Sequence, residues 1–387
     1  VNTMDNHYDV IVVGSGPGGA TVAKELSQKG KRVLILEWGD NAPITGTALQ
    51  FYTKAGIPGK GLMITDGLLG MVRGITTGGS SVFYYGTAFS PPTDMLNKFG
   101  VDISREVDEV RAELPTEPLA PHLIGPMANR LMKSARELGF SWNPMPKFVF
   151  QERCQPNCWR CNFGCPFGAK WNARMFVHQA IDNGATLVTG AKVQRVLTEG
   201  RQAVGVAYKR KGTDHSVRAP IVVLGAGGAG TPMILRASGI NTAGYDWFYD
   251  PLITVMGDVA DIEGGKEFPM ATGMHVDEDG YVMTDMTVPF SLHALFNLEV
   301  FKFSKIPAHS RTLTIMIKIK DELGGRLTKN GHVRKGLRKE DKEKFTRGYS
   351  RAAKILKNAG AKDVWKSWYV AAHPGGTAKI GDILDAD

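Results

Sequence analysis

The first part of the chain alternates short apolar runs with a glycine-rich turn and a helical pattern. An apolar run at residues 8–13 leads into GSGPGG, a helical pattern covers residues 20–29, and a second apolar run, RVLILE, covers residues 32–37. Two such runs joined through a helix are typical of a βαβ unit, which requires a parallel sheet. The pattern therefore predicts an α/β fold that begins with parallel strands.

The rest of the chain changes pattern several times. Residues 39–92 are rich in loop-forming Gly and Pro, residues 107–140 have a helical pattern, and a helix is expected around residues 173–183. Short alternating strands are expected over residues 186–224, whereas residues 242–370 combine longer strands with a charged helix. The expected domains are a first domain in three parts (1–100, 151–241 and 371–387), a helical cap (101–150) and a second, antiparallel-sheet domain (242–370).

Composition fits an ordinary globular protein of more than one core. The 387 residues are 43% hydrophobic and 22% charged, and a chain of this length is expected to form two intertwined domains. No run of about 18 apolar residues predicts a membrane-spanning helix. The N-terminal VNTMDNHYDV lacks a secretory pattern, so a cytoplasmic location is expected, with a partner subunit or a membrane surface left open.

The charge balance is basic, with a net charge of +9 and a pI near 9.2. Its densest basic stretch, residues 334–347, mixes in acids at helical spacing and predicts a solvated helix face. No nucleic-acid recognition motif accompanies the charge, so we expect no nucleic acid as a partner. We instead expect the basic charge to serve an acidic electron-acceptor protein as the partner.

The glycine-rich turn has the spacing of a dinucleotide site. Gly14, Gly16 and Gly19 form G-x-G-x-x-G directly after a strand and at the start of a helix. In this context the glycines allow a tight turn, a close approach to a pyrophosphate, and close packing of helix on strand. Glu37 ends the second strand, where a carboxylate can accept ribose hydroxyls. The alternative is a glycine turn that holds no ligand.

Two further glycine-rich segments resemble the signatures of the glucose–methanol–choline (GMC) oxidoreductases. They are VRGITTGGSSVFYYGTAF (residues 72–89) and GAGGAGTPMILRASGI (residues 225–240). The resemblance implies that the first segment lies along FAD and its pyrophosphate, and that the second belongs to the same cofactor domain. The cofactor-binding residues expected from it are Arg73, Gly78, Gly79, Ser80, Ser81 and Gly227.

HPGGTAKIG (residues 373–381) resembles the C-terminal motif of the same family. The resemblance implies that His373 faces flavin N5 and the substrate carbinol. Oxidation of an alcohol by hydride transfer needs a base for the hydroxyl proton, and a neutral imidazole suits that role. The alternative is a histidine that caps a turn before Pro374. GMC chains normally continue past this motif with a second His or Asn, whereas the given sequence stops at Asp387, so no residue of it is named as the second catalytic group.

All four cysteines lie within twelve residues, as C-x3-C-x2-C-x3-C-P. They are Cys154, Cys158, Cys161 and Cys165. The spacing resembles the bacterial ferredoxin run with one extra residue. It also resembles the iron–sulfur-containing FAD glucose dehydrogenases of the GMC superfamily, which implies a [4Fe–4S] or [3Fe–4S] cluster near the flavin. Structural zinc is the main alternative, followed by disulfides or free thiols.

The sequence thus predicts a Rossmann-like, glutathione-reductase-like FAD-binding domain interleaved with an α+β substrate domain built on an antiparallel sheet. The function expected is an FAD-dependent dehydrogenase that oxidises an alcohol or sugar and passes electrons through an iron–sulfur cluster to an acidic redox protein or a quinone. The alternatives are an alcohol oxidase with structural zinc, and a non-catalytic flavin-binding electron-transfer subunit. Each of these three functions is compatible with a partner subunit or a homo-oligomer. Apolar residues of the second domain fit a pocket or a core equally well, so no substrate is assigned: Met274, Phe290, Phe296, Trp365.

Overall fold

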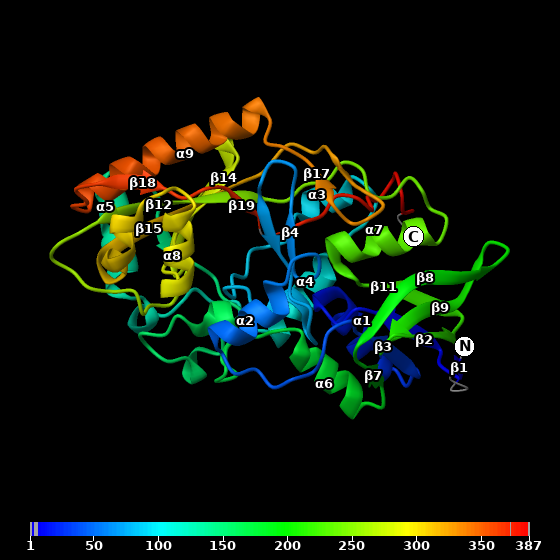
Figure 1. Ribbon diagram of the computed structural model, residues 1–387. Helices are drawn as coiled ribbons and strands as arrows, with labels where there is room; N and C mark the ends of the chain where they lie inside the picture. Colours follow the sequence, from blue (N-terminus) through cyan, green and yellow to red (C-terminus); the bar gives the residue numbers. More distant parts are fainter. Residues whose placement is uncertain (1, 4–6, 372, 386–387) are drawn as a thin grey trace.

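Two sheets dominate the computed structural model, which describes residues 2–3, 7–371 and 373–385 (Figure 1). The first sheet is parallel, in the strand order β11-β2-β3-β7. Its strands are β2 (Val10–Val13), β3 (Val33–Leu36), β7 (Thr186–Val188) and β11 (Ile221–Leu224). Every residue of β2 and β3 is buried, as expected for central strands covered on both faces. The predicted βαβ unit is present.

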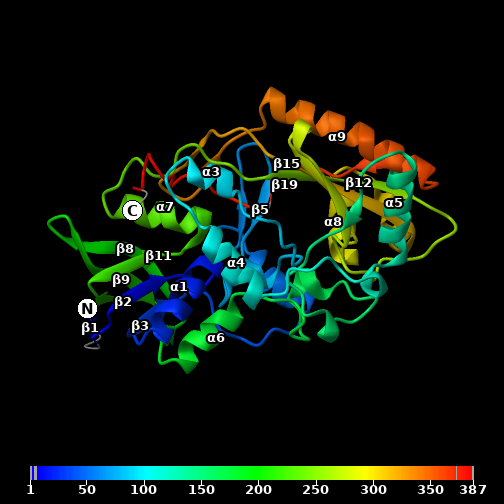
Figure 2. The same ribbon diagram turned by 180° about the vertical axis from the view of Figure 1, so that it is seen from behind.

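Helices α1 (Pro17–Gln28) and α6 (Arg174–Asp182) cover one face of this sheet and contact each other, as Figure 2 shows from behind. The other face packs against α7 (Gly227–Ala237) and a smaller sheet in the order β1-β10-β9-β8. Its strands are β1 (Asn2–Thr3), β8 (Ala191–Glu199), β9 (Gln202–Arg210) and β10 (Thr213–Arg218). These layers place the glycine turn after β2 at the edge where α1 begins.

The second sheet is larger and mainly antiparallel, with nine strands among the described residues. Its path is β4-β5-β19-β12-β15-β14-β13-β6, and β18 also pairs with β12. The bounds are β4 (Leu62–Ile64), β5 (Gly70–Val72), β6 (Asn143–Pro144), β12 (Pro251–Asp258), β13 (Thr272–Val276), β14 (Tyr281–Asp285), β15 (Thr312–Ile319), β18 (Val364–Lys366) and β19 (Val370–Ala371). A separate hairpin pairs β16 (Arg326–Leu327) with β17 (Val333–Arg334).

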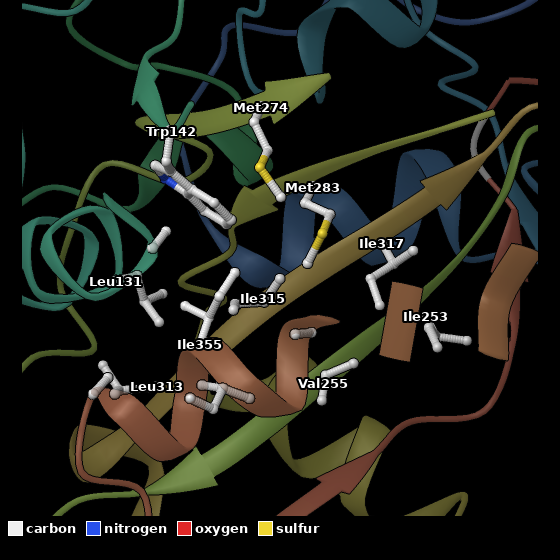
Figure 3. Packing of buried hydrophobic residues seen from close by; sticks show 14 of the residues in the cluster. Leu131, Trp142, Ile253, Val255, Met274, Met283, Leu313, Ile315, Ile317 and Ile355 are labelled. Atoms are coloured by element: carbon white, nitrogen blue, oxygen red, sulfur yellow. The ribbon is translucent and has the colours of Figure 1, made fainter. Parts of the chain in front are cut away.

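One face of the large sheet is covered by α5 (Pro126–Glu137) and α9 (Lys339–Asn358). Figure 3 shows the core between them, where Trp142, Met274 and Ile315 meet Ile355 of α9. The other face carries a second apolar cluster, in which Phe296 of α8 (Phe290–Leu298) packs near Trp365. Met274, Phe296 and Trp365 are therefore buried core residues, whereas Phe290 is exposed.

The helical pattern of residues 107–140 is interrupted rather than continuous. Helix α4 (Ser104–Glu113) and α5 are separated by a segment that contains Pro115, Pro118 and a 3-10 turn at Pro121–Leu123. Proline removes a backbone donor and cannot continue a helix, which explains the break. The loop-rich stretch also contains a short helix, α2 (Ala48–Ala55), and a second short helix, α3 (Thr93–Asn97), follows directly after it. Over the described ranges, no helix is both long and apolar enough to cross a membrane.

Candidate functional site: a dinucleotide turn, a histidine and a cysteine loop

The turn after β2 is closed on two sides by neighbouring backbone. Gly14 has φ +92°, and a Cβ there would lie 2.5 Å from the carbonyl oxygen of Gly225. A Cβ on Gly19 would lie 2.0 Å from the carbonyl oxygen of Gly14, so only glycine fits either position. Gly16 has open space around it and directly precedes α1. A pyrophosphate therefore fits against Gly16, where the free N–H groups of α1 begin.

Glu37 supports this turn directly. Its carboxylate accepts hydrogen bonds from the Ser15 backbone N (3.0 Å), the Ser15 hydroxyl (2.6 Å) and the Gly39 N (2.6 Å). Burial raises the pKa of Glu37, while these three hydrogen bonds act in the opposite direction. The predicted ribose contact stays a prediction. In the structure Glu37 also stabilises the conformation of the glycine turn through these hydrogen bonds.

The segment expected to lie along FAD contacts the same turn. The backbone N of Gly78 donates to the Ser15 hydroxyl at 3.2 Å, and a Cβ on Gly79 would lie 3.0 Å from Cα of Gly16. Both glycines have positive φ, at +88° and +58°. The two glycine-rich segments therefore form one continuous backbone surface, which suits a pyrophosphate that must lie close to main chain.

The two serines of this segment bind protein backbone. The Ser81 hydroxyl donates to the Gly78 carbonyl oxygen (2.6 Å) and accepts from the Ala173 N (2.9 Å). The more exposed Ser80 accepts from the Gly74 N at 3.0 Å. Ser81 thus fixes the loop internally, and Ser80 is the serine of this pair that faces outward.

Arg73 lies apart from the glycine loop, beside the residue that follows Glu37. Its guanidinium is 5.5 Å from the ring centre of Trp38, and its Nε donates to the Lys60 carbonyl oxygen at 2.9 Å. The ammonium groups of Lys60 and Lys192 lie 5.6 and 4.4 Å from the same ring. Burial lowers the pKa of Arg73. Three cations around one aromatic ring form a positively charged cluster beside the expected ribose site.

The second glycine-rich segment joins the dinucleotide turn to the histidine motif. Gly227 has φ +75° and opens α7, with free space around its Cβ position. A Cβ on the next residue, Gly228, would lie 1.9 Å from the carbonyl oxygen of Pro374. Glycine at 228 therefore lets the His373–Pro374 backbone contact the start of α7, even though the two segments are far apart in sequence.

His373 belongs to a small polar group centred on Asp250, whose two other members, Asp250 and Lys318, no sequence motif indicates. Its Nδ1 lies 2.7 Å from Oδ2 of Asp250, and Nζ of Lys318 lies 2.9 Å from the same oxygen. Lys318 Nζ is also 3.4 Å from His373 Nδ1. Burial disfavours the Asp250 carboxylate, but hydrogen bonds from His373 and Lys318 and their charges hold its pKa below the usual range.

The register of the large sheet creates this group. Asp250 immediately precedes β12, and Lys318 in β15 pairs with Leu252 of β12. The side chain of His373 remains 60% exposed, so one edge of the ring is open. Because Nδ1 faces Asp250, the open nitrogen is Nε2, which is available to bind or accept a proton.

The four cysteines line one cavity, together with Lys170, Phe167 and Phe268. Cys161 and Cys165 are buried, Cys154 and Cys158 are half-buried, and none forms a disulfide. Burial, reinforced by the neighbouring thiols, raises the pKa of Cys154 to about 12. Across the described ranges, no set of three or more His, Cys, Asp or Glu side chains is arranged to hold a metal ion. The loop thus gathers soft donors around one space without arranging them as a finished ion site.

Lys170 connects the cysteine loop to residues 72–89, the segment expected to lie along FAD, which we call the FAD segment. Its fully buried ammonium donates to the carbonyl oxygens of Cys161 (2.7 Å), Val82 (2.9 Å) and Tyr84. Burial lowers the pKa of Lys170 to about 8, opposed by the nearby thiols of Cys161 and Cys165. One side chain therefore ties together two loops that the sequence separates.

These features define an α/β dinucleotide-binding protein with an antiparallel second domain. The family model of the GMC oxidoreductases matches residues 8–253, and the chain belongs to this family. Membership implies FAD as the cofactor, and the glycine surface described above fits its pyrophosphate.

Relatives and solved structures agree with the family. An uncharacterized GMC-type oxidoreductase of Mycobacterium tuberculosis is 32% identical over 254 residues, which are 60% of this chain and 39% of that protein. A long-chain-alcohol oxidase (FAO3) of Arabidopsis thaliana is 23% identical over 92% of this chain and 53% of its own length. An uncharacterized protein of Methanocaldococcus jannaschii is 28% identical over 96% of this chain and 88% of its own length. The chain thus spans well under half of the mycobacterial relative.

Among solved structures, pyridoxine 4-oxidase from Mesorbium loti has a TM-score of 0.67 at 16% identity, over 92% of this chain and 81% of that one. Formate oxidase has a TM-score of 0.64 at 15% identity, over 91% and 82%. The predicted fold class, a parallel FAD-binding sheet with an antiparallel substrate-domain sheet, is confirmed.

Proposed function

We propose that the protein is an FAD-dependent oxidoreductase that oxidises an alcohol at its CH–OH carbon, with His373 as the general base. The observation that carries this proposal is the His373–Asp250–Lys318 group, which lies against the start of α7 with one ring edge open. The long-chain-alcohol oxidases among the relatives support an alcohol as the electron donor.

Asp250 determines which ring nitrogen of His373 acts. When Nδ1–H donates to the Asp250 carboxylate at 2.7 Å, the lone pair of Nε2 points away from the pair and can accept the hydroxyl proton. The imidazolium that results is stabilised by the Asp250 carboxylate. Lys318 balances the charge of Asp250 at 2.9 Å and keeps it ionised. Bound FAD supplies the hydride acceptor for this reaction.

For the cysteine loop we propose an iron–sulfur cluster held by Cys154, Cys158, Cys161 and Cys165. The ferredoxin-like spacing and the shared cavity support it, and the buried positive charge of Lys170 complements a set of thiolates. Such a cluster transfers single electrons, which would make the protein a dehydrogenase that serves an external acceptor. Its neighbour is the FAD segment, through the Lys170 contacts with Val82 and Tyr84.

An alcohol oxidase is the second candidate, because oxidases are named among both the relatives and the similar folds. In that case the cysteines would hold structural zinc or remain thiols, and oxygen would be the electron acceptor. Peroxide formed in stoichiometric amounts during turnover would favour the oxidase over the dehydrogenase.

Anaerobic mixing of the FAD-loaded protein with an alcohol panel tests the activity. We expect at least one alcohol to bleach the flavin band, and His373→Ala to slow bleaching by roughly 10²- to 10⁴-fold with FAD content unchanged. His332→Ala, at an exposed histidine, is the matched control and should reduce flavin at the wild-type rate. Flavin that no alcohol bleaches would instead support the non-catalytic electron-transfer subunit.

Iron, sulfide and zinc analysis of anaerobically purified protein tests the cysteine proposal. We expect iron and sulfide together with a broad visible absorption that dithionite bleaches, and a loss of both in Cys161→Ser. Zinc in place of iron, or metal-free thiols that react with a thiol reagent, would overturn the cluster while leaving the alcohol proposal intact.

A further inference from the structure

One face of the large sheet carries both the histidine group and an apolar cluster. Alternation along a strand places every second side chain on the same face. In β15, Met316 belongs to the cluster on the α8 side of the sheet, whereas Ile317 belongs to the core under α9. Lys318, two residues beyond Met316, therefore lies on the α8 side. Because Lys318 contacts Asp250 and His373, this face begins at the candidate base.

Two threonine hydroxyls lie in the next row of this face. Thr254 of β12 and Thr284 of β14 pair with Met316 from either side, and directly paired side chains share a face. Both threonines are fully buried, and among the described residues neither hydroxyl has a hydrogen-bond partner. Buried hydroxyls are normally hydrogen-bonded, because an unpaired one loses its water without replacement. Two unpaired hydroxyls that flank one residue therefore indicate a site for a polar group of a ligand.

The neighbours of this row come from the segments expected to meet FAD and substrate. Tyr85 of the FAD segment and Val370 of β19, three residues before His373, pack against the same apolar cluster. Two residues along a strand span roughly 7 Å, so the row of the threonines lies about that far from Lys318. A molecule that holds its carbinol at His373 can therefore extend over Met316 to both hydroxyls.

The remaining side chains of this face are apolar and adaptable. The cluster contains Leu252, Met256, Met270, Met286, Val288, Phe296, Met316 and Trp365. Methionine side chains are flexible and pack against apolar groups of different shape. An ionised group placed among them would lose its water, and Lys318 is already paired with Asp250. The face therefore fits an alkyl chain with a neutral polar group.

Helix α8 covers this face, on the side of the sheet opposite α9 (Figure 1). Its Leu292 and Phe296 pack against the cluster, and the hydroxyl of its Ser291 is also buried without a partner among the described residues. Helix α8 contacts the 3-10 segment Phe303–Arg311 more extensively than any strand, whereas α9 packs directly on β12, β14 and β15. Helix α8 is thus the more loosely packed cover, and a ligand reaches the threonines when its side chains move aside.

We propose that Thr254 and Thr284 determine specificity by binding a second hydroxyl group of the alcohol substrate. The substrate class is an apolar chain with a hydroxyl group at each end. A hydroxyl donates and accepts at once, so it can serve both threonines whichever way each of them points. A simple alcohol of the same length would leave the threonines unpaired and bind more weakly. This inference rests on the proposed function, since the carbinol must lie at His373.

Anaerobic flavin reduction with matched alcohols tests the inference. Hexanol, octanol and decanol are compared with the corresponding terminal diols. We expect at least one diol to give half-maximal reduction at a concentration roughly tenfold lower than its mono-alcohol, well beyond the effect of two equivalent ends. Thr254→Val and Thr284→Val should each reduce this preference severalfold, with reduction by the mono-alcohols unchanged.

Denaturant unfolding gives a second readout. A valine in place of an unpaired hydroxyl removes no hydrogen bond, so both valine variants should unfold at the wild-type midpoint or above it. Thr272→Val is the matched control. Its hydroxyl donates to Asp285 and accepts from Trp142, so this variant should unfold at lower denaturant and keep the diol preference.

Three outcomes would contradict the inference, and they differ from one another. Reduction by mono-alcohols with no preference for any diol would overturn the inference and leave the proposed function intact, and so would a preference that both valine variants retain. Valine variants that are destabilised like Thr272→Val would show that the hydroxyls are already paired. Flavin that no alcohol reduces would overturn the proposed function and this inference with it.

Discussion

The orientation of the His373 ring depends on Asp250, whose backbone has an unusual conformation. Asp250 has φ +52°, and its backbone N donates to Oδ1 of Asp321 at 3.0 Å. Asp321 is buried and paired with Lys335 at 2.5 Å. A buried ion pair thus fixes the backbone of the residue that orients the histidine. Positive φ at a non-glycine residue costs energy and persists where the surroundings determine it.

We predict that Asp250→Asn slows flavin reduction by about 100-fold, within the range that a positioned base contributes, while FAD content stays the same. The neutral amide can no longer stabilise an imidazolium or select the Nδ1–H form. Anaerobic stopped-flow reduction measures the effect. Asp246→Asn is the control, because Asp246 also has positive φ but pairs with Lys379 instead. A wild-type rate in Asp250→Asn would exclude the positioning role.

At the scale of elements, the glycine turn is the point where β2, α1, the FAD segment and α7 come within contact. Gly14 contacts Gly225, Gly79 contacts Gly16, and Gly78 binds the Ser15 hydroxyl. A Cβ at Gly14 would overlap the Gly225 backbone, and a Cβ at Gly79 would be in tight contact with Gly16. The pyrophosphate surface is therefore made by the packing of elements, and a change in one of them displaces the others.

Two adjacent glycines on α1 test this arrangement. We predict that Gly19→Ala destabilises the fold by roughly 1–3 kcal/mol and abolishes FAD binding, because its methyl group would overlap the Gly14 carbonyl. Gly18→Ala meets open space on the same helix and should be neutral, or more stable by up to about 1 kcal/mol. Denaturant unfolding and flavin titration report both quantities. Equal behaviour of the two variants would contradict the packing argument.

For the molecule as a whole, one buried carboxyl group, that of Glu267, links stability to pH at the start of α5. Glu267 accepts hydrogen bonds from the Met127 N (3.0 Å) and the Ala128 N (3.3 Å) at the start of α5. Burial raises the pKa of Glu267 to about 7, and the backbone hydrogen bonds only partly offset it. The folded protein therefore holds a proton that the unfolded chain releases at lower pH.

This linkage predicts the pH dependence of stability. Stability from protonated Glu267 is fully present below the ordinary glutamate pKa of 4.5 and is lost as pH rises toward 7, by at most about 3 kcal/mol. Glu267→Gln cannot ionise, so the unfolding free energy of the wild type relative to this variant should fall between pH 5 and pH 8. Denaturant unfolding at both pH values measures the difference. Glu263→Gln, at an exposed position, should track the wild type.

Local pattern was sufficient for much of this architecture. The βαβ unit and its turn were predictable because Gly14 and Gly19 are required by backbone geometry that the motif encodes. Prolines within residues 107–140 carried a signal for the helix break that the apolar pattern alone did not reveal. His373 was predicted through its family motif, and its catalytic role stays a prediction.

The partners of His373 had no such local signal. Asp250 lies 123 residues before it and Lys318 lies 55 residues before it. The register between β12 and β15 brings Lys318 to Asp250, and the pairing of β19 with β12 and of His373 N with the Tyr249 carbonyl oxygen brings the histidine to both. Lys170 was missed for the same reason, since its three acceptors are carbonyl oxygens, which every sequence position provides. Long-range pairing of this kind depends on tertiary structure.

The contact between Gly228 and Pro374 has a consequence for how the protein is made. The turn at Gly14 leaves the ribosome early, whereas the histidine segment follows roughly twenty seconds to a minute later at ordinary rates of translation. During that interval the nascent chain contains the glycine turn but lacks the His373–Pro374 segment, which contacts the start of α7 in the folded protein. Flavin that binds to the growing polypeptide would contact only part of its site. Tight binding of the coenzyme therefore requires synthesis of the histidine segment.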